Sequence, residues 1–194
     1  ANNTVWTQSK QVTIGTKAGY TIRYTTNGSN PSSTNGAVYT GVFTITANCT
    51  VKAAYISSTN RVGMIGSAAT NLIDTENPVS GISVGTISLT SIALNGWGSD
   101  TQSGVQSYHF QWSTDGVNYA TAGPFYTSAN PYAYQISGLA QYTTYYLRVI
   151  VTDNAGRQTI SGVTSARTYH ATTYCAGGKG EECTASRGNA HGGH

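Results

Sequence analysis

Apolar and polar residues alternate with a period of two in several segments of the chain, which is typical of half-buried β-strands. In residues 20–25, Tyr, Ile and Tyr alternate with Thr, Arg and Thr, and residues 108–113 repeat the pattern with Tyr, Phe and Trp. Residues 145–151 place Tyr, Leu and two Val on one strand face. Because good helix formers are scarce while Thr, Ser, Gly, Asn and Tyr abound, we expect almost no helix.

Turn-forming residues separate these segments. The stretch 27–36 holds two Gly and one Pro among Asn and Ser residues, which predicts a loop. Ala and Asn join residues 42–46 to residues 49–55, so these two segments are expected to form a hairpin. Two further tight turns are expected at 113–116 and at 153–156.

The chain divides near Pro78. Proline cannot donate a ladder hydrogen bond and favours an extended predecessor, so residues 74–78 are expected to form a short, stiff linker. We therefore expect one domain at 1–73, a second at 79–168, and a tail at 169–194 with too few apolar residues for a core. The expected fold class is all-β, with two tandem β-sandwiches followed by an irregular C-terminal tail.

The first half resembles a known module in the spacing of its strand-turn-strand segments. The run Tyr24–Pro31, followed by Val38–Gly41 and Thr50–Ala53, is similar to the small immunoglobulin-like domain at the C-terminus of chitobiases and β-hexosaminidases. The same module is strung along large bacterial surface proteins. The resemblance implies an accessory module with a structural or adhesive role, and not the catalytic barrel of those enzymes.

The second half resembles a fibronectin type III or related bacterial immunoglobulin-like domain. Its Gly138-Leu139 pair precedes Tyr145 with the spacing of the tyrosine corner, in which a buried hydroxyl bonds back to the backbone. Trp97 departs from the family pattern, because it follows the strand at 92–94 and stands between two glycines. We therefore expect Trp97 in a loop, and the resemblance leaves the register of residues 95–104 open.

The distribution of charged residues limits the classes of partner that we expect for this chain. Charged residues make up 9% of the chain, with a net charge of +3, and five dispersed cations precede residue 74 without any carboxylate. Five scattered charges without an arginine-rich run are a weak nucleic-acid footprint, so no nucleic-acid partner is expected. No apolar run approaches the roughly 20 residues of a membrane helix, so no membrane insertion is expected. The initial Ala1 suits removal of a secretion leader, and we expect an extracellular protein.

The placement of acidic residues argues against catalysis. Glycoside hydrolysis needs two carboxylates facing one cleft, whereas residues 1–73 contain none and Asp115 and Asp153 stand in turn sequences. No Gly-x-Ser-x-Gly elbow and no phosphate-binding loop is present. We expect no enzymatic activity and no cofactor.

Three cysteines raise the question of cross-links. Cys175 and Cys183 bracket a Gly-rich loop of seven residues, and in a secreted chain they could form a disulfide. Cys49 shares strand parity with Val51 and Ala53, so it is either a small buried apolar residue or an intermolecular disulfide partner. The run Tyr-Cys-Ala-Gly-Gly is similar to Cys-x-Gly-Gly tails in surface proteins of Gram-positive anaerobes.

The tail also carries potential metal ligands. Imidazole and thiolate donors suit tetrahedral zinc, although their spacing matches no recognised zinc-finger pattern. The candidate ligands are His170, Cys175, Cys183, His191 and His194.

Two functions compete. In the first, the chain is a self-associating subunit of a bacterial surface appendage or filament. Its residues 3–8, anchored by Trp6, then add to a neighbour's sheet edge, unless they are the module's own first strand. In the second, the chain is a carbohydrate-binding or adhesive module whose exposed Trp97 or Trp6 stacks on a polysaccharide. A passive, ligand-free spacer is a third possibility.

Overall fold

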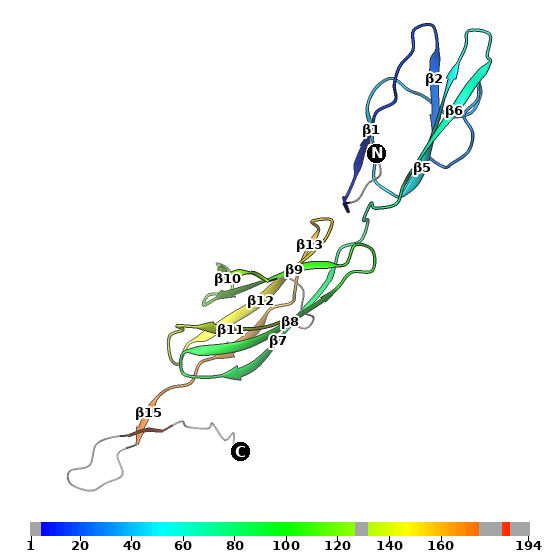
Figure 1. The fold of residues 1–194 in the computed structure, drawn as a ribbon. Coiled ribbons are helices and arrows are strands. Elements are labelled where there is room, and N and C mark those ends of the chain that lie inside the picture. The colour runs from blue at the N-terminus through cyan, green and yellow to red at the C-terminus, as the bar shows by residue number, and fades with distance from the viewer. Residues whose placement is uncertain (1–4, 127–131, 175–183, 187–194) are drawn as a thin grey trace, which may run out of the picture. The chain divides into compact units, whose positions relative to one another are not determined.

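The computed structural model describes residues 5–126, 132–174 and 184–186. These residues form β-strands and no helix, which confirms the all-β prediction. In this described part, no helix is long and apolar enough to cross a membrane. The chain divides into two compact units, shown by their strands in Figure 1.

Unit 1 comprises Ala1–Asn77 with two later loops, Thr101–Gly104 and Asn154–Arg157. The domain limits that the sequence suggests stay a prediction. The segment that follows Ile73 is held within this unit, because Arg157 donates hydrogen bonds of 2.9 and 3.2 Å to the Asp74 carbonyl oxygen. The strands of unit 1 are β1 (Lys10–Val12), β2 (Thr21–Thr25), β3 (Ala37–Val38), β4 (Phe43–Ile45), β5 (Cys49–Ile56) and β6 (Val62–Thr70).

Two antiparallel sheets build unit 1. One has the order β3-β2-β5-β6, and the other pairs β1 with β4. Ile22, Ile45, Val51, Ala54 and Ile56 of unit 1 are all less than 9% exposed. In the β2–β5 register, Ile22 and Val51 lie on one face of the four-stranded sheet, and Ala54 and Ile56 lie on the other.

The expected hairpin of residues 42–46 and 49–55 is wrong. Strand β4 pairs with β1, whereas β5 pairs with β2 and β6, so the connection crosses between sheets. The Asn48 side-chain oxygen accepts a 2.8 Å hydrogen bond from the Ile73 backbone N–H. Asn48, which was expected in the hairpin turn, therefore binds the backbone at Ile73, 25 residues further along the chain.

The expected loop between β2 and β3 is confirmed. Gly28 and Gly36 adopt φ of 77° and 98°, a region that only residues without a Cβ enter readily. Gly36 also approaches the backbone closely, since a Cβ there would lie 2.7 Å from the Tyr24 carbonyl oxygen. The Arg23 guanidinium donates a 2.6 Å hydrogen bond to the Gly36 carbonyl, which fixes the end of the loop.

Unit 2 comprises Pro78–Asp100, Val105–Asp153 and Gln158–His194. It contains β7 (Val79–Ile87), β8 (Ser91–Ser99), β9 (Val105–Ser113), β10 (Ala120–Tyr126), β11 (Tyr132–Ser137), β12 (Thr144–Asp153), β13 (Gln158–Ile160), β14 (Thr164–Arg167), β15 (Thr172–Tyr174) and β16 (Thr184–Ser186).

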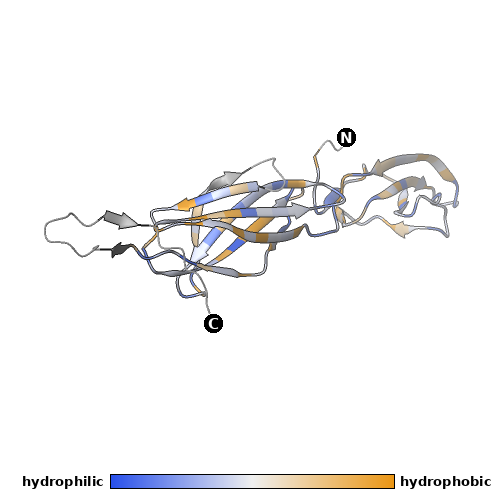
Figure 2. Cartoon of the chain, turned by 90° about the horizontal axis from the view of Figure 1, so that it is seen from below, coloured by the Kyte–Doolittle hydropathy of each residue, from blue (hydrophilic) through white to orange (hydrophobic). Residues whose placement is uncertain are grey.

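The core of unit 2 lies between two antiparallel sheets. One has the order β10-β9-β12-β13, with β14 also paired to β12, and the other has the order β11-β8-β7. Apolar and polar residues alternate along these strands, as the mixed orange and blue ribbons of Figure 2 show. Phe110, Leu147, Val149 and Val151 are fully buried, as the period-two pattern predicts.

The tyrosine corner is present. The Tyr145 ring is 3% exposed, and its hydroxyl accepts a 2.8 Å hydrogen bond from the Ala140 backbone N–H. The turn between β9 and β10 is also confirmed, because Asp115 accepts hydrogen bonds from Ser113 and from the N–H groups of the residues that follow. Strands β12 and β13 flank the turn that was expected at 153–156.

Candidate functional site

Trp97 lies on a strand, and the expected loop position is wrong. It belongs to β8, in which Gly96 and Gly98 point into the core and Trp97 points outward. The core leaves no room for larger side chains, since a Cβ on Gly96 would lie 2.8 Å from the Phe110 ring. The two glycines that suggested a loop therefore permit close packing between the sheets.

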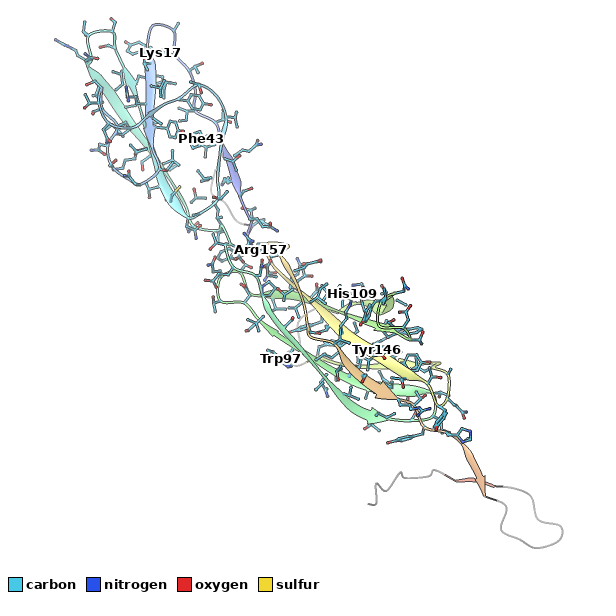
Figure 3. All side chains as sticks on the ribbon, turned by 180° about the vertical axis from the view of Figure 1, so that it is seen from behind. Lys17, Phe43, Trp97, His109, Tyr146 and Arg157 are labelled. Atoms are coloured by element: carbon cyan, nitrogen blue, oxygen red, sulfur yellow. The ribbon has the colours of Figure 1, made fainter. Side chains whose placement is uncertain are left out.

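The indole of Trp97 covers the backbone of a neighbouring strand. Trp97 is directly opposite Gly81 of β7. A Cβ on Gly81 would lie 2.2 Å from each of two adjacent indole carbons and 2.6 Å from the indole nitrogen. These similar distances to neighbouring ring atoms place one face of the indole over Gly81. The ring nevertheless remains 46% exposed, and Figure 3 shows it pointing away from the sandwich.

Among the described residues, the outer face around Trp97 carries no charge and consists mostly of small side chains. The next row of the sheet holds Ala133, Asn95 and Ser83, from β11, β8 and β7 respectively. Gln135 is exposed on the same face and donates a 2.9 Å hydrogen bond to the Ser91 hydroxyl. None of the residues in β7, β8 and β11 carries a charge. Sequence reasoning selected Trp97 but missed Gly81, because that pairing depends on strand register.

Trp6 belongs to unit 1 and is half-buried. Next to it, the Thr7 N–H donates to the Leu72 carbonyl at 3.0 Å, and the Thr7 carbonyl accepts from the Asp74 N–H at 2.8 Å. These bonds form an isolated parallel bridge between Thr7 and Ile73. Within this chain, Thr7 thus pairs with its own module. This agrees with the arrangement in which residues 3–8 belong to their own module, and not with addition to a neighbour's sheet edge.

Strand β6 is the last strand of its sheet, and among the described residues no strand pairs with its outer edge. Its nine residues include neither a charged residue nor proline. The side chains of Val62 and Met64 are 42% and 92% exposed. Sequence reasoning did not select this strand, although its lack of charge and proline was a readable signal.

A groove runs beside the edge of β6. Its volume is about 500 Å³, and its walls are residues 10–15, in and after β1, and residues 66–70 of β6. Val51 and Ala53 of β5 also line the groove. The two sheets of unit 1 therefore leave an open slot beside the edge strand. Its lining is mixed, with polar residues such as Lys10 and Gln11 beside small apolar ones.

The structure describes only part of the expected cysteine and metal sites. Cys49 carries a free thiol and is half-buried, and burial raises the pKa of this thiol, which lowers its reactivity. The candidate disulfide Cys175–Cys183 and the candidate ligands His191 and His194 lie outside the described residues. His170 is exposed and contacts the Tyr142 ring edge-on, with ring centroids 5.5 Å apart.

The described acidic residues of unit 2 include one carboxylate held in a turn and two that lie close together. Asp115 is held in its turn by the Ser113 hydroxyl and the Asn118 amide, which lower the pKa of its carboxyl well below the usual range. Asp153 is fully buried at the end of β12, with a carboxylate oxygen within 4.8 Å of one from Asp100.

Comparison with known proteins supports the fold. The sequence profile of the family described as Fn3 associated matches residues 12–69. No curated protein matches the chain. Domains A168–A170 of titin are 16% identical with a TM-score of 0.55, over 86% of this chain and 61% of that fragment. The FN1–FN3 domains of chicken CNTN1 are 14% identical with a TM-score of 0.45, over 86% of this chain and 64% of that one.

The family match over residues 12–69, the likeness to the titin domains and the sheet topology show a fibronectin type III-like fold. The chain spans 61% of the length of the titin fragment, and at 16% identity the likeness concerns the fold alone. The resemblance to chitobiase modules and to Cys-x-Gly-Gly tails stays a prediction.

Proposed function

We propose that the chain is a non-catalytic, self-associating structural subunit of a bacterial surface appendage or filament, and that copies associate through β6. The observation that carries this proposal is the long, uncharged outer edge of that strand. Fibronectin type III-like modules are typically non-catalytic, which agrees with the scarcity of carboxylates. The bacterial surface location rests on the sequence resemblance to surface modules.

Unprotected edges are unusual in proteins that stay monomeric. An edge strand presents a row of backbone N–H and C=O groups to any extended chain, and natural proteins block it with charges, proline, bulges or covering elements. The sequence of β6 supplies neither charge nor proline between Val62 and Thr70. The register of its pairing with β5 shifts between Ile65 and Val62, and from Ile65 to Thr70 the pairing is regular. The 92% exposure of Met64 adds an apolar side chain that is costly to leave in water.

The groove beside β6 gives the incoming strand a specific place. When an extended segment adds to a sheet edge, backbone hydrogen bonds supply affinity and pockets for alternate side chains supply specificity. The slot between residues 10–15 and 66–70 is lined by Val51 and Ala53 and also by polar residues such as Lys10, so it suits a segment in which small apolar and polar side chains alternate. The donor in this proposal is an extended segment of a second copy, because every copy then offers both partners.

Replacement of Met64 by lysine tests the proposal. Its side chain is almost fully exposed, so Met64→Lys is expected to leave folding intact while placing a charge on the edge. Sedimentation velocity and negative-stain electron microscopy of the full chain should show assemblies for the wild type and mostly monomers for the variant. Val117→Lys is the matched control, since Val117 is 78% exposed but belongs to unit 2. A monomeric wild type, or equal assembly of wild type and Met64→Lys, would contradict the proposal.

A further inference from the structure

We propose that the outer face of the β11-β8-β7 sheet binds a neutral polysaccharide, with the indole of Trp97 as the stacking surface. The face belongs entirely to unit 2, whereas β6 belongs to unit 1. This site is therefore separate from the edge through which copies are proposed to associate, and it adds a ligand to that structural role.

The position of the indole is the first argument. Because one ring face lies over Gly81 and the side chain is still 46% exposed, the opposite face is turned to solvent. The face of an aromatic ring carries partial negative charge, which attracts the weakly positive C–H groups on the flat side of a pyranose. A ring fixed on the sheet loses little conformational freedom when a sugar stacks on it, so little of the stacking energy is lost to ordering.

The surroundings of the indole are the second argument. Gly81, Gly85, Ala93 and Ala133 share the outer face, and these small residues leave the indole standing above a low surface. Among the described residues, these small side chains leave room beside the indole for an extended sugar chain. The side chains that rise near Trp97 include the Asn95 amide and the Ser83 hydroxyl, which can hydrogen-bond sugar hydroxyl groups. They also include the apolar Val79, which is 54% exposed opposite Ser99.

Asn95 is the best placed of these polar groups. It lies two residues before Trp97 on the same face of β8, roughly 7 Å along the strand. In the part of the chain that the structure describes, no hydrogen bond engages its side-chain amide, although the side chain is half-buried. The exposed Ser83 is directly opposite Asn95 on β7. An amide and a hydroxyl thus adjoin the aromatic ring.

Charge and composition decide between ligand classes. No charged residue occurs in the three strands, so the face complements a neutral chain and offers no cation to a uronate or phosphate polymer. A protein partner of ordinary affinity would be expected to meet a cluster of several large apolar or arginine side chains. Trp97 is the single aromatic residue on the outward positions of β7, β8 and β11. A neutral glycan fits this pattern better than a protein does.

A purely structural role for Trp97 must be separated from binding. An aromatic ring that covers a cross-strand glycine stabilises a sheet, and that role needs the ring but not the nearby amide. Trp97→Ala would affect both roles, whereas Asn95→Ala leaves the ring in place and Trp97→Phe retains an aromatic surface. The three variants together distinguish glycan binding from sheet stabilisation.

The test is calorimetric titration of the full chain with cellohexaose, chitohexaose and mannohexaose, with polygalacturonate as an anionic control. At least one neutral hexasaccharide should bind. Trp97→Ala should weaken that binding by about tenfold and Asn95→Ala by about threefold, while Trp97→Phe retains more than Trp97→Ala does. The matched control is Tyr142→Ala. Tyr142 is also well exposed, at 58%, but the Arg167 guanidinium lies over its ring, 3.4 Å from the ring centroid, and takes the place that a stacked sugar would need.

Several outcomes would overturn the proposal. These are failure of all three neutral probes to bind, unchanged affinity in both Trp97→Ala and Asn95→Ala, or equal loss in Tyr142→Ala. A change in sedimentation but not in glycan affinity for Trp97→Ala would assign the face to a protein partner instead. If Trp97→Ala does not fold, judged by near-ultraviolet circular dichroism, Asn95→Ala and Trp97→Phe decide. Glycan binding by Met64→Lys should equal that of the wild type. The glycan test therefore gives a clear answer even if the proposed association through β6 proves wrong.

Discussion

Substitution of Gly98 by alanine should destabilise unit 2, although alanine usually favours a folded chain more than glycine does. Gly98 is buried in β8. A Cβ there would lie 2.7 Å from a Val151 methyl group and 2.9 Å from the Val79 carbonyl oxygen. Neither neighbour can give way easily, because Val151 is fully buried in the opposite sheet and the Val79 oxygen belongs to the backbone.

The magnitude follows from two opposing effects. Forcing a methyl group into a packed core costs about 1–3 kcal/mol. Replacing glycine by alanine restricts the unfolded chain and returns about 0.5–1 kcal/mol. The net loss in the free energy of unfolding is then about 1 kcal/mol, which lowers the midpoint temperature of a domain of this size by about 4–8 °C.

Gly85 provides the matched control within the same sheet. A Cβ on Gly85 would lie 3.4 Å from the Ala93 Cβ and 3.5 Å from the Ala93 carbonyl oxygen, which are ordinary contacts. Gly85→Ala should therefore be neutral or stabilising by up to about 1 kcal/mol.

Differential scanning calorimetry of the full chain compares these variants, and a shift limited to one transition would assign it to one unit. The reasoning fails if Gly98→Ala is as stable as the wild type, or if both variants shift the midpoint equally.

Two further predictions concern the loops of unit 2. Tyr145→Phe removes the acceptor of the Ala140 N–H and should lower the free energy of unfolding by about 1–3 kcal/mol in urea denaturation; an unchanged midpoint would refute a stabilising tyrosine corner. The Ser113 hydroxyl and Asn118 amide lower the pKa of Asp115, so its stabilising contribution is complete above the unfolded pKa near 3.8 and is lost as pH falls through the folded pKa. Carboxyl-carbon NMR of Asp115 should give a midpoint below 3.8, and a midpoint at or above that value would contradict these hydrogen bonds.

The sequence predicted features that depend on neighbouring residues. The alternation at 108–113 identified β9, and the Asn, Ser, Gly and Pro content of 27–36 identified a loop. The tyrosine corner was also readable, because Tyr145 and its partner Ala140 lie five residues apart within one family motif. Local propensity and short motifs determine such elements before any long-range contact forms.

Features that depend on distant partners were not predictable. Residues 42–46 and 49–55 have the pattern of a hairpin, but β4 pairs with β1 because the core of unit 1 places that segment in the other sheet. The edge position of β6 follows only from the complete strand order. Period-two alternation tells which residues of a strand share a face, but it does not tell which strand lies beside it.

Trp97 shows most clearly which features follow from the sequence alone and which follow only from the tertiary structure. By itself, the sequence determined an all-β chain of two parts, a low content of charged residues, and an aromatic residue between two glycines. Only the tertiary structure decided that Gly96 and Gly98 face the core and that the indole covers Gly81. The physical reason is that strand register and the approach of two sheets arise from side-chain packing between segments far apart in the chain, and short-range pattern does not encode that packing.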